Sequence, residues 1–184
     1  NGDYGQIKFT TGLFYLHERF YVERDGYSRR NAQNTNPVTT PGNYNFLRAH
    51  NVTNTDAYAV FGEATWSATD RLKITAGLRW TNEEKTFTFD NAVLNLAGQV
   101  VAPSIKGQSD KIWSAITPKL SVQYAWTPDI LQYVTYSKGF KSGGFDNRAA
   151  RLDLATLPFA PEDVITYETG LKSELLDHRL RANL

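Results

Sequence analysis

The sequence predicts an all-β protein: an antiparallel up-and-down transmembrane β-barrel wall of about seven strands. Three observations lead to this fold class. Apolar and polar residues alternate with a period of two along several stretches, and one hairpin carries an apolar band of bilayer length with aromatic ends. Short turns also alternate with long polar connections along the chain.

The hairpin between Tyr58 and Trp80 carries the alternation most clearly. The even-numbered residues of its second half, from Leu72 to Trp80, are apolar, whereas the odd-numbered ones are polar or glycine. A three-residue turn at 68–70 pairs Trp66 with Leu72 and places both apolar stripes on one face. The nine residues 72–80 then span on the order of 23 Å at a tilt of about 40°, which fits the lipid-facing band of an outer-membrane barrel.

The hairpin alone leaves a second interpretation open, because a soluble antiparallel sheet with one face on a core shows the same alternation. Composition narrows the choice only partly. The chain has 184 residues, enough for one sizeable domain, with 20 basic and 19 acidic residues, so its net charge of +1 favours neither nucleic acid nor an acidic partner. It has no cysteine, and no apolar run approaches the roughly 18 residues of a spanning helix.

One further strand and two long connections flank this hairpin. Alternation predicts a strand over 6–20, and the polar stretch 21–51, broken by Pro37, Pro41 and Gly42, predicts a long loop. The strand that begins at Leu72 continues to residue 89, and we expect a second connection over 90–110.

The next hairpin runs from residue 112 to 138. Pro118 lies inside its first strand, 112–126, where a proline predicts a bulge or another irregularity. A two-residue turn at Pro128 and Asp129 pairs Trp126 with Leu131. A third polar connection follows over about 139–160.

The last strand pair begins at residue 161. Its first strand, 161–176, alternates, and a two-residue turn at Asp177 and His178 pairs Glu174 with Arg181. The short turns therefore all fall at one end of the strands and the long connections at the other, as in outer-membrane barrels with short periplasmic turns and long extracellular loops.

Catalytic and metal-binding patterns are weak in this sequence. His17, His50 and His178 are far apart and form no ligand pair, and the nucleophile elbow GxSxG is missing. The glycine-rich stretch 139–144 lacks the order of a phosphate-binding loop. We therefore expect no enzyme activity, no metal site and no cofactor.

Candidate binding residues fall into two groups. The first comprises charged residues of the polar strand face, which we expect to point into the lumen and to form cross-strand pairs: Arg79, Glu83, Glu168 and Lys172. The second comprises residues of the long connections that suit an anionic, partly aromatic ligand such as a metal chelate: Arg29, Arg30, Tyr44, Arg48, Lys141 and Arg148.

Several segments in combination resemble the β-barrel domain of TonB-dependent outer-membrane receptors of the siderophore-receptor type. They are YVTYSKGFKSGGF at 133–145, PEDVITYETGLK at 161–172, RANL at 181–184, AGLRWTNE at 76–83 and GLFY at 12–15. The resemblance covers nearly the whole chain.

The resemblance implies a barrel of about 22 strands in the bacterial outer membrane, filled by an N-terminal plug domain. It further implies import of ferric siderophores or similar scarce nutrients, with energy transmitted by TonB through the N-terminal region. We expect 1–184 to be a partial barrel domain without the plug and the closing strands, with outer-membrane lipid, the nutrient chelate, TonB and the plug as partners. A passive porin or structural barrel and a soluble β-rich binding module are the alternatives.

Overall fold

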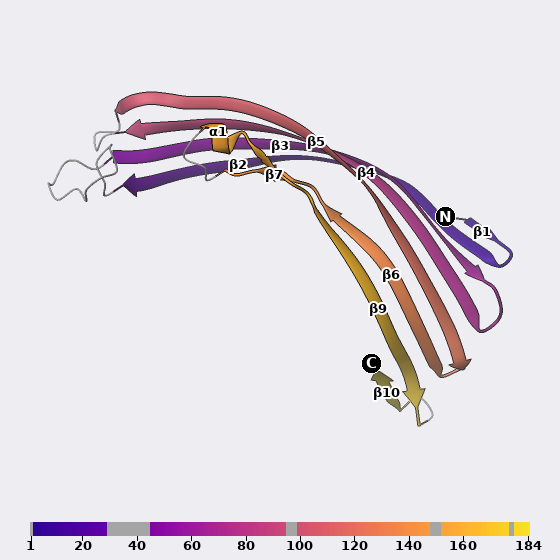
Figure 1. Ribbon diagram of the computed structural model, residues 1–184. Helices are drawn as coiled ribbons and strands as arrows, with labels where there is room; N and C mark the ends of the chain where they lie inside the picture. The colour runs from indigo at the N-terminus through magenta and orange to yellow at the C-terminus, as the bar shows by residue number, and fades with distance from the viewer. Residues whose placement is uncertain (1, 29–44, 95–98, 148–151, 177–178) are drawn as a thin grey trace.

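A computed structural model describes residues 2–28, 45–94, 99–147, 152–176 and 179–184, which form one long antiparallel sheet (Figure 1). Its eight strands lie side by side in chain order, except that β9 follows β6. Two further strands, β7 and β8, pair with each other within the β6–β9 connection. The predicted all-β, antiparallel, up-and-down fold class is confirmed.

The strands of the sheet are β1 (Gly2–Tyr4), β2 (Ile7–Ser28), β3 (Asn45–Ser67), β4 (Leu72–Leu94), β5 (Val100–Thr127), β6 (Ile130–Lys141), β9 (Glu162–Leu175) and β10 (Leu180–Asn183). The β6–β9 connection holds β7 (Gly144–Phe145), α1 (Leu152–Ala155) and β8 (Pro158–Phe159). Among the described residues, no helix has the length and apolar character needed to cross a membrane.

One side of the sheet, which we term the apolar face, exposes a continuous set of large apolar side chains. The strand register brings Leu13, Val60, Leu78, Ile116 and Val134 to this side, each more than half exposed. Sheet faces of soluble proteins rarely expose this much contiguous apolar surface, because it promotes association in water. The opposite side is termed the polar face.

Aromatic side chains mark both ends of the apolar band. At one end the rings of Tyr15 and Tyr58 lie 5.0 Å apart, and Trp80 follows on β4. At the other end, near the short turns, Trp66 and Trp126 are about half exposed. This arrangement matches the two aromatic girdles of a transmembrane barrel.

The four strands β2 to β5 are longer than the sequence predicts, so the predicted loops are wrong at 21–28 and 45–51 and at 90–94 and 100–110, which are strand. Cross-strand pairing continues through Glu23 opposite His50 and Asp90 opposite Lys106, the latter with an ion pair of 2.8 Å. A ladder of backbone hydrogen bonds needs no apolar side chains, so a strand that leaves the bilayer reads as a polar loop in sequence. Residues 29–44 lie outside the described part.

The register of the β3–β4 hairpin differs by two positions from the prediction. Trp66 pairs with Ile74 rather than Leu72. The Thr69 hydroxyl accepts hydrogen bonds from the backbone N–H groups of Arg71 and Leu72, at 3.2 and 2.9 Å, and so stabilises a longer turn. The even shift keeps both apolar stripes on the same face.

The register predicted for β5 and β6 is wrong, because the observed pairing is shifted by one residue and so differs in parity. Ala125, not Trp126, pairs with Leu131, and a bulge lies between Ala125 and Thr127. One extra residue on one strand reverses the facing of everything beyond it. Tyr133 therefore pairs with Gln123 and lies on the polar face. The predicted β9–β10 register, with Glu174 opposite Arg181, is confirmed, although residues 177–178 lie outside the described part.

Pro118 coincides with an irregularity of a different kind from a bulge. It pairs in regular register with Leu78 of β4. The β5–β6 ladder, however, ends one residue later, at Lys119 opposite Ser137, and β6 continues to Lys141 with β9 as its only partner in the sheet. Beyond this point β5 and β6 separate.

The connections are sorted as the sequence predicts, with one exception. The strand ends joined by the turns β1–β2, β3–β4, β5–β6 and β9–β10 lie at one end of the sheet, and the strand ends joined by the β2–β3, β4–β5 and β6–β9 connections lie at the other (Figure 1). The β4–β5 connection is short, because only residues 95–99 separate the two strands.

Replacing Leu78 with Arg tests whether the apolar face contacts lipid. The side chain is 56% exposed on that face, and an arginine there should cost about 2 kcal/mol of stability in a bilayer. Folding of the full-length protein into lipid vesicles, followed by denaturant titration, measures this cost. Thr10→Arg, on the polar face opposite Glu63, is the control. Equal stability of both variants would contradict a lipid-facing role.

Candidate functional site

The polar face carries a network of compensated charges on the half nearest the short turns. Lys119 Nζ lies 2.8 Å from Glu63 Oε2, and the Tyr133 hydroxyl donates a 2.6 Å hydrogen bond to Glu168. The Lys172 ammonium lies 5.6 Å from the centre of the Tyr133 ring. These side chains line a shallow hollow of about 540 Å³. Acidic and basic groups alternate across it, so it suits a polar partner surface rather than a strongly charged ligand.

Hydroxyl pairs tie neighbouring strands together within this hollow. Thr65 and Thr75 are 2.8 Å apart, and Ser121 and Thr135 are also 2.8 Å apart. Cross-strand hydroxyl contacts of this kind stabilise a sheet by about 0.2 to 1 kcal/mol each. They keep the floor of the hollow polar without adding charge.

Arg79 lies next along the polar face and is held by aromatic rings rather than by a carboxylate. Its guanidinium carbon is 5.0 Å from the Phe14 ring centre and 5.9 Å from that of Phe61. Its Nε–H donates to the Thr81 hydroxyl at 3.0 Å. Contacts with two rings and a hydroxyl favour this orientation of the guanidinium and lower the entropy that it would lose on binding an acceptor.

The half of the polar face nearest the longer connections is covered by part of the β6–β9 connection. We term its described residues, 142–147 and 152–161, the strap. Phe145 of the strap stacks on Phe87 with a ring separation of 5.3 Å and an interplanar angle of 9°, and its edge meets Trp113 at 6.2 Å. Phe87, Phe89 and Ala155 form a fully buried cluster against which Phe145 packs.

Polar contacts fix the beginning of the strap beside this cluster. Lys85 Nζ donates to the Ser142 hydroxyl at 2.9 Å and to the Gly143 carbonyl at 3.1 Å, and it lies 3.0 Å from Glu83. The Ser142 hydroxyl in turn donates to Glu83. Because Lys85 and Glu83 are only 20% exposed, this charge pair is better shielded from solvent than the pairs of the hollow.

The strap approaches the wall so closely that only glycine fits at position 143. A Cβ atom there would lie 2.2 Å from the Phe159 carbonyl oxygen and 2.6 Å from Trp113 Nε1. Further along, Asn51 Nδ2 donates to the Asn147 carbonyl at 2.8 Å. The strap is therefore attached to β3, β4 and β5 at once.

The sequence analysis did not identify the aromatic cluster, although one signal for it exists. On β4 the apolar residues are even-numbered up to Trp80, but the aromatic residues Phe87 and Phe89 are odd-numbered. Such a change of parity within one regular strand means that the apolar side has moved to the opposite face. Here it marks the point where the large apolar side chains of β4 move from the exposed apolar face to the face that the strap covers.

The predicted lumen-facing residues Arg79, Glu83, Glu168 and Lys172 all lie on the polar face. They do not form one site: Glu83 belongs to the strap contact, Glu168 and Lys172 line the hollow, and Arg79 lies between.

The residues predicted to contact substrate do not lie together in the structure. Lys141 lies at the end of β6 on the polar face, 3.7 Å from Glu162, and both side chains are at least 70% exposed. Arg48 is exposed on the opposite side, in register with the apolar face. The structure does not describe Arg29, Arg30, Tyr44 and Arg148.

Histidines and acidic residues do not gather in the described part of the chain. His17 Nδ1 lies 2.9 Å from Asp56 Oδ1, and the His50 ring lies 5.0 Å from Tyr21. Within residues 2–28, 45–94, 99–147, 152–176 and 179–184, no group of three or more His, Asp and Glu side chains is placed to hold a metal ion.

Comparison with known proteins gives one consistent result. Residues 1–184 match the family model described as TonB dependent receptor-like, beta-barrel. The pesticin receptors of Yersinia enterocolitica and Yersinia pestis are 27% identical over 137 residues, which is 74% of this chain and 19% of theirs. The metal-pseudopaline receptor CntO of Pseudomonas aeruginosa is 37% identical over 76 residues, 41% of this chain and 10% of that receptor.

Solved structures show the same fold. The ferric yersiniabactin uptake receptor FyuA from Yersinia pestis superposes with a TM-score of 0.73 at 20% identity, covering 96% of this chain and 25% of that one. The siderophore receptor PiuA from Acinetobacter baumannii superposes with a TM-score of 0.61 at 16% identity, covering 99% and 28%. The chain thus spans about a quarter or less of the proteins that it matches.

A Gly143→Ala substitution should dislodge the strap. The new methyl group has to displace the Phe159 backbone or the Trp113 ring, and such overpacking costs about 1 to 3 kcal/mol. Limited proteolysis of the full-length protein should then cleave the β6–β9 connection faster. Gly139→Ala is the matched control, since its Cβ would meet only Val164 at 3.8 to 3.9 Å. Unchanged protease resistance of Gly143→Ala would contradict the tight fit.

A double-mutant cycle should detect the contact between strap and wall. Phe87→Ala alone should cost about 3 kcal/mol, as expected for a fully buried ring, and its coupling to Phe145→Ala should be about 0.5 to 1.5 kcal/mol. Denaturant titration of the full-length protein measures both quantities. The control cycle pairs Phe87 with Phe20, which is half exposed two strands away on the same face. Equal coupling in the two cycles would show that Phe145 is not docked.

Proposed function

This chain belongs to the TonB-dependent receptor-like β-barrel family over its full length, and we propose that it forms part of the wall of an outer-membrane receptor that imports a scarce nutrient with energy supplied through TonB. The family is one of transport receptors rather than enzymes. The observation that carries the proposal is the family match over residues 1–184, which coincides with a sheet that is apolar on one face and charge-compensated on the other.

The chain supplies only a part of such a receptor. It corresponds to 19% of the length of the pesticin receptors, so the plug domain, the TonB-contacting segment and the remaining strands belong to other parts of the proposed protein. The exposed apolar face supports contact with outer-membrane lipid.

The hollow on the polar face suits contact with the plug. Its carboxylates already have partners within the wall: Glu63 forms an ion pair with Lys119, and Glu168 accepts a hydrogen bond from the Tyr133 hydroxyl. A surface whose charges are paired within the wall leaves no buried unpaired charge when a partner docks on it, and no ion pair has to break when that partner moves away. A plug that shifts during transport needs a wall of this kind.

We propose a metal chelate of the siderophore class as the cargo. The names of three similar receptors refer to ferric yersiniabactin, to a siderophore and to a metal-pseudopaline complex. Lys141, exposed on the polar face beside the strap, is a candidate contact for an anionic chelate. Arg29, Arg30, Tyr44 and Arg148 of the connections remain candidates on the sequence argument, whereas Arg48 is directed to the opposite side.

Uptake measurements test this proposal. Cells that lack the full-length gene should fail to accumulate one radiolabelled ferric siderophore that wild-type cells import, and deletion of TonB should abolish that uptake in wild-type cells. Uptake that persists without TonB would instead indicate a passive porin. Normal growth of the deletion strain on every iron chelate would redirect the search to other nutrients.

A further inference from the structure

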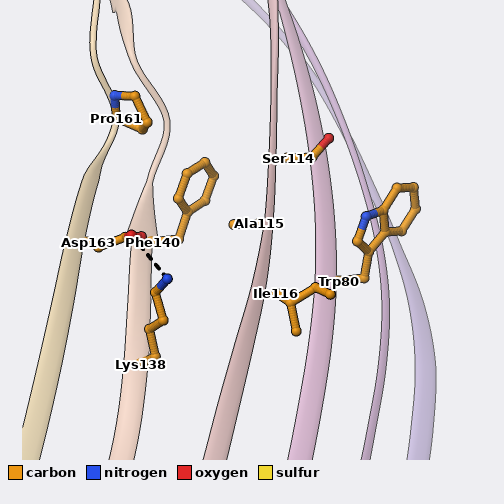
Figure 2. A pocket seen from close by; sticks show the side chains of 8 residues that line it. All are labelled: Trp80, Ser114, Ala115, Ile116, Lys138, Phe140, Pro161 and Asp163. Atoms are coloured by element: carbon orange, nitrogen blue, oxygen red, sulfur yellow. Dashed lines mark ion pairs between the residues drawn. The ribbon is translucent and has the colours of Figure 1, made fainter.

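A notch opens on the apolar face where β5 and β6 separate beyond Lys119 and Ser137. It has a volume of about 500 Å³ and lies between two groups of side chains, as Figure 2 shows. Trp80, Ser114, Ala115 and Ile116 come from β4 and β5, and Lys138, Phe140, Pro161 and Asp163 come from the side of β6 and β9.

The backbone of β5 is unpaired along one side of this notch. From Ile112 to Pro118, β5 pairs with β4 alone, and in the described part of the chain no backbone hydrogen bond joins this edge to β6. Unpaired N–H and C=O groups cannot face lipid tails without a cost of several kcal/mol each. Whatever fills the notch must therefore both donate and accept hydrogen bonds.

The notch is also lined by large apolar side chains and is continuous with the band that faces the bilayer. Trp80 is 45% exposed and Ile116 is 57% exposed, and the Phe140 ring lies across the gap from them (Figure 2). The aromatic pair of Tyr136 and Tyr167 lies on the same face, and Tyr136 is the residue of β6 that precedes Lys138 on this face. Aromatic side chains of membrane proteins sit at the level of the lipid headgroups.

A cation with spare hydrogen-bonding capacity completes the lining. Lys138 Nζ lies 3.0 Å from Asp163 Oδ2, as the dashed line in Figure 2 marks, and its side chain is 28% exposed. An ammonium group has three donors, and a single carboxylate oxygen uses one of them. The remaining donors are available to an anionic oxygen in the notch.

We propose that the notch binds a phosphorylated glycolipid of the outer leaflet. Sugar hydroxyls, which donate and accept, match the unpaired β5 edge, a phosphate contacts Lys138, and an acyl chain lies against Trp80 and Ile116. The strap closes the same gap on the polar face, where Gly143 meets Trp113, so the lipid is kept out of the lumen. The inference rests on the proposed outer-membrane placement.

Lipid titration of the full-length receptor tests the inference. The protein is purified from outer membranes, stripped of lipid in mild detergent and titrated with lipid A, and binding is followed by native mass spectrometry. Wild-type receptor should bind lipid A in preference to phosphatidylcholine. Ser114→Trp, which fills the notch, should abolish this binding. Lys138→Gln, which removes a charge-assisted contact without adding bulk, should weaken it about tenfold.

Val60→Trp is the matched control for added bulk, since Val60 is exposed on the same face directly opposite Trp80 of the neighbouring strand. This variant should bind lipid A as the wild type does. Equal binding by wild type, Ser114→Trp and Lys138→Gln would overturn the inference and leave a water-filled notch, and equal binding of phosphatidylcholine would overturn the glycolipid assignment. If the wild type fails to fractionate with outer membranes, the proposed function itself fails.

Discussion

Continuity of the backbone hydrogen-bond ladder is the constraint on which the rest of this structure depends. A strand that crosses a bilayer has no water to satisfy its N–H and C=O groups, so each strand must pair with a neighbour on both sides. From β2 to β5 this condition holds over more than 20 paired positions at each boundary. Between β5 and β6 the pairing stops at Lys119, and the two special features of the wall occur there.

The strap and the notch both lie where the β5–β6 ladder ends, on opposite faces of the sheet. On the polar face, Phe145 and the Lys85–Glu83–Ser142 contacts hold the strap over the region where β5 loses its partner. On the apolar face the same break leaves an amphipathic notch beside Lys138. The polar hollow near the short turns differs from both, because it lies where all the ladders are complete and its charges are compensated within the wall. The structure thus separates the region near the longer connections, where the strap is fixed to the wall, from the polar hollow near the short turns.

The sequence predicted the order, direction and facing of most strands, because one apolar face imposes a period of two that is easy to read. The prediction of strand ends and turn registers failed where the sequence shows no such alternation. The strand continuations at 21–28 and 100–110 mix polar, charged and turn-forming residues with a few apolar ones in no clear alternation, and they looked like loops. The bulge before Thr127 and the two-residue shift at Trp66 depend on local turn hydrogen bonds that residue types do not specify. Of the candidate site, the facing of Arg79, Glu83, Glu168 and Lys172 followed from periodicity, whereas the contact of Glu83 with Ser142 joins residues 59 positions apart and could not be predicted from it.

The sequence by itself therefore determined the fold class, the face that most strands present and the family, since alternation, girdle aromatics and local motifs are properties of short segments. Only the tertiary structure decided the strand lengths, the end of the β5–β6 ladder and the docking of the strap. These features depend on contacts between distant segments: Phe87, Phe89 and Trp113 became a buried cluster only because Gly143 lets the chain after β6 turn back against the wall. A period of two shows which face a side chain is on, but it cannot show what will cover that face.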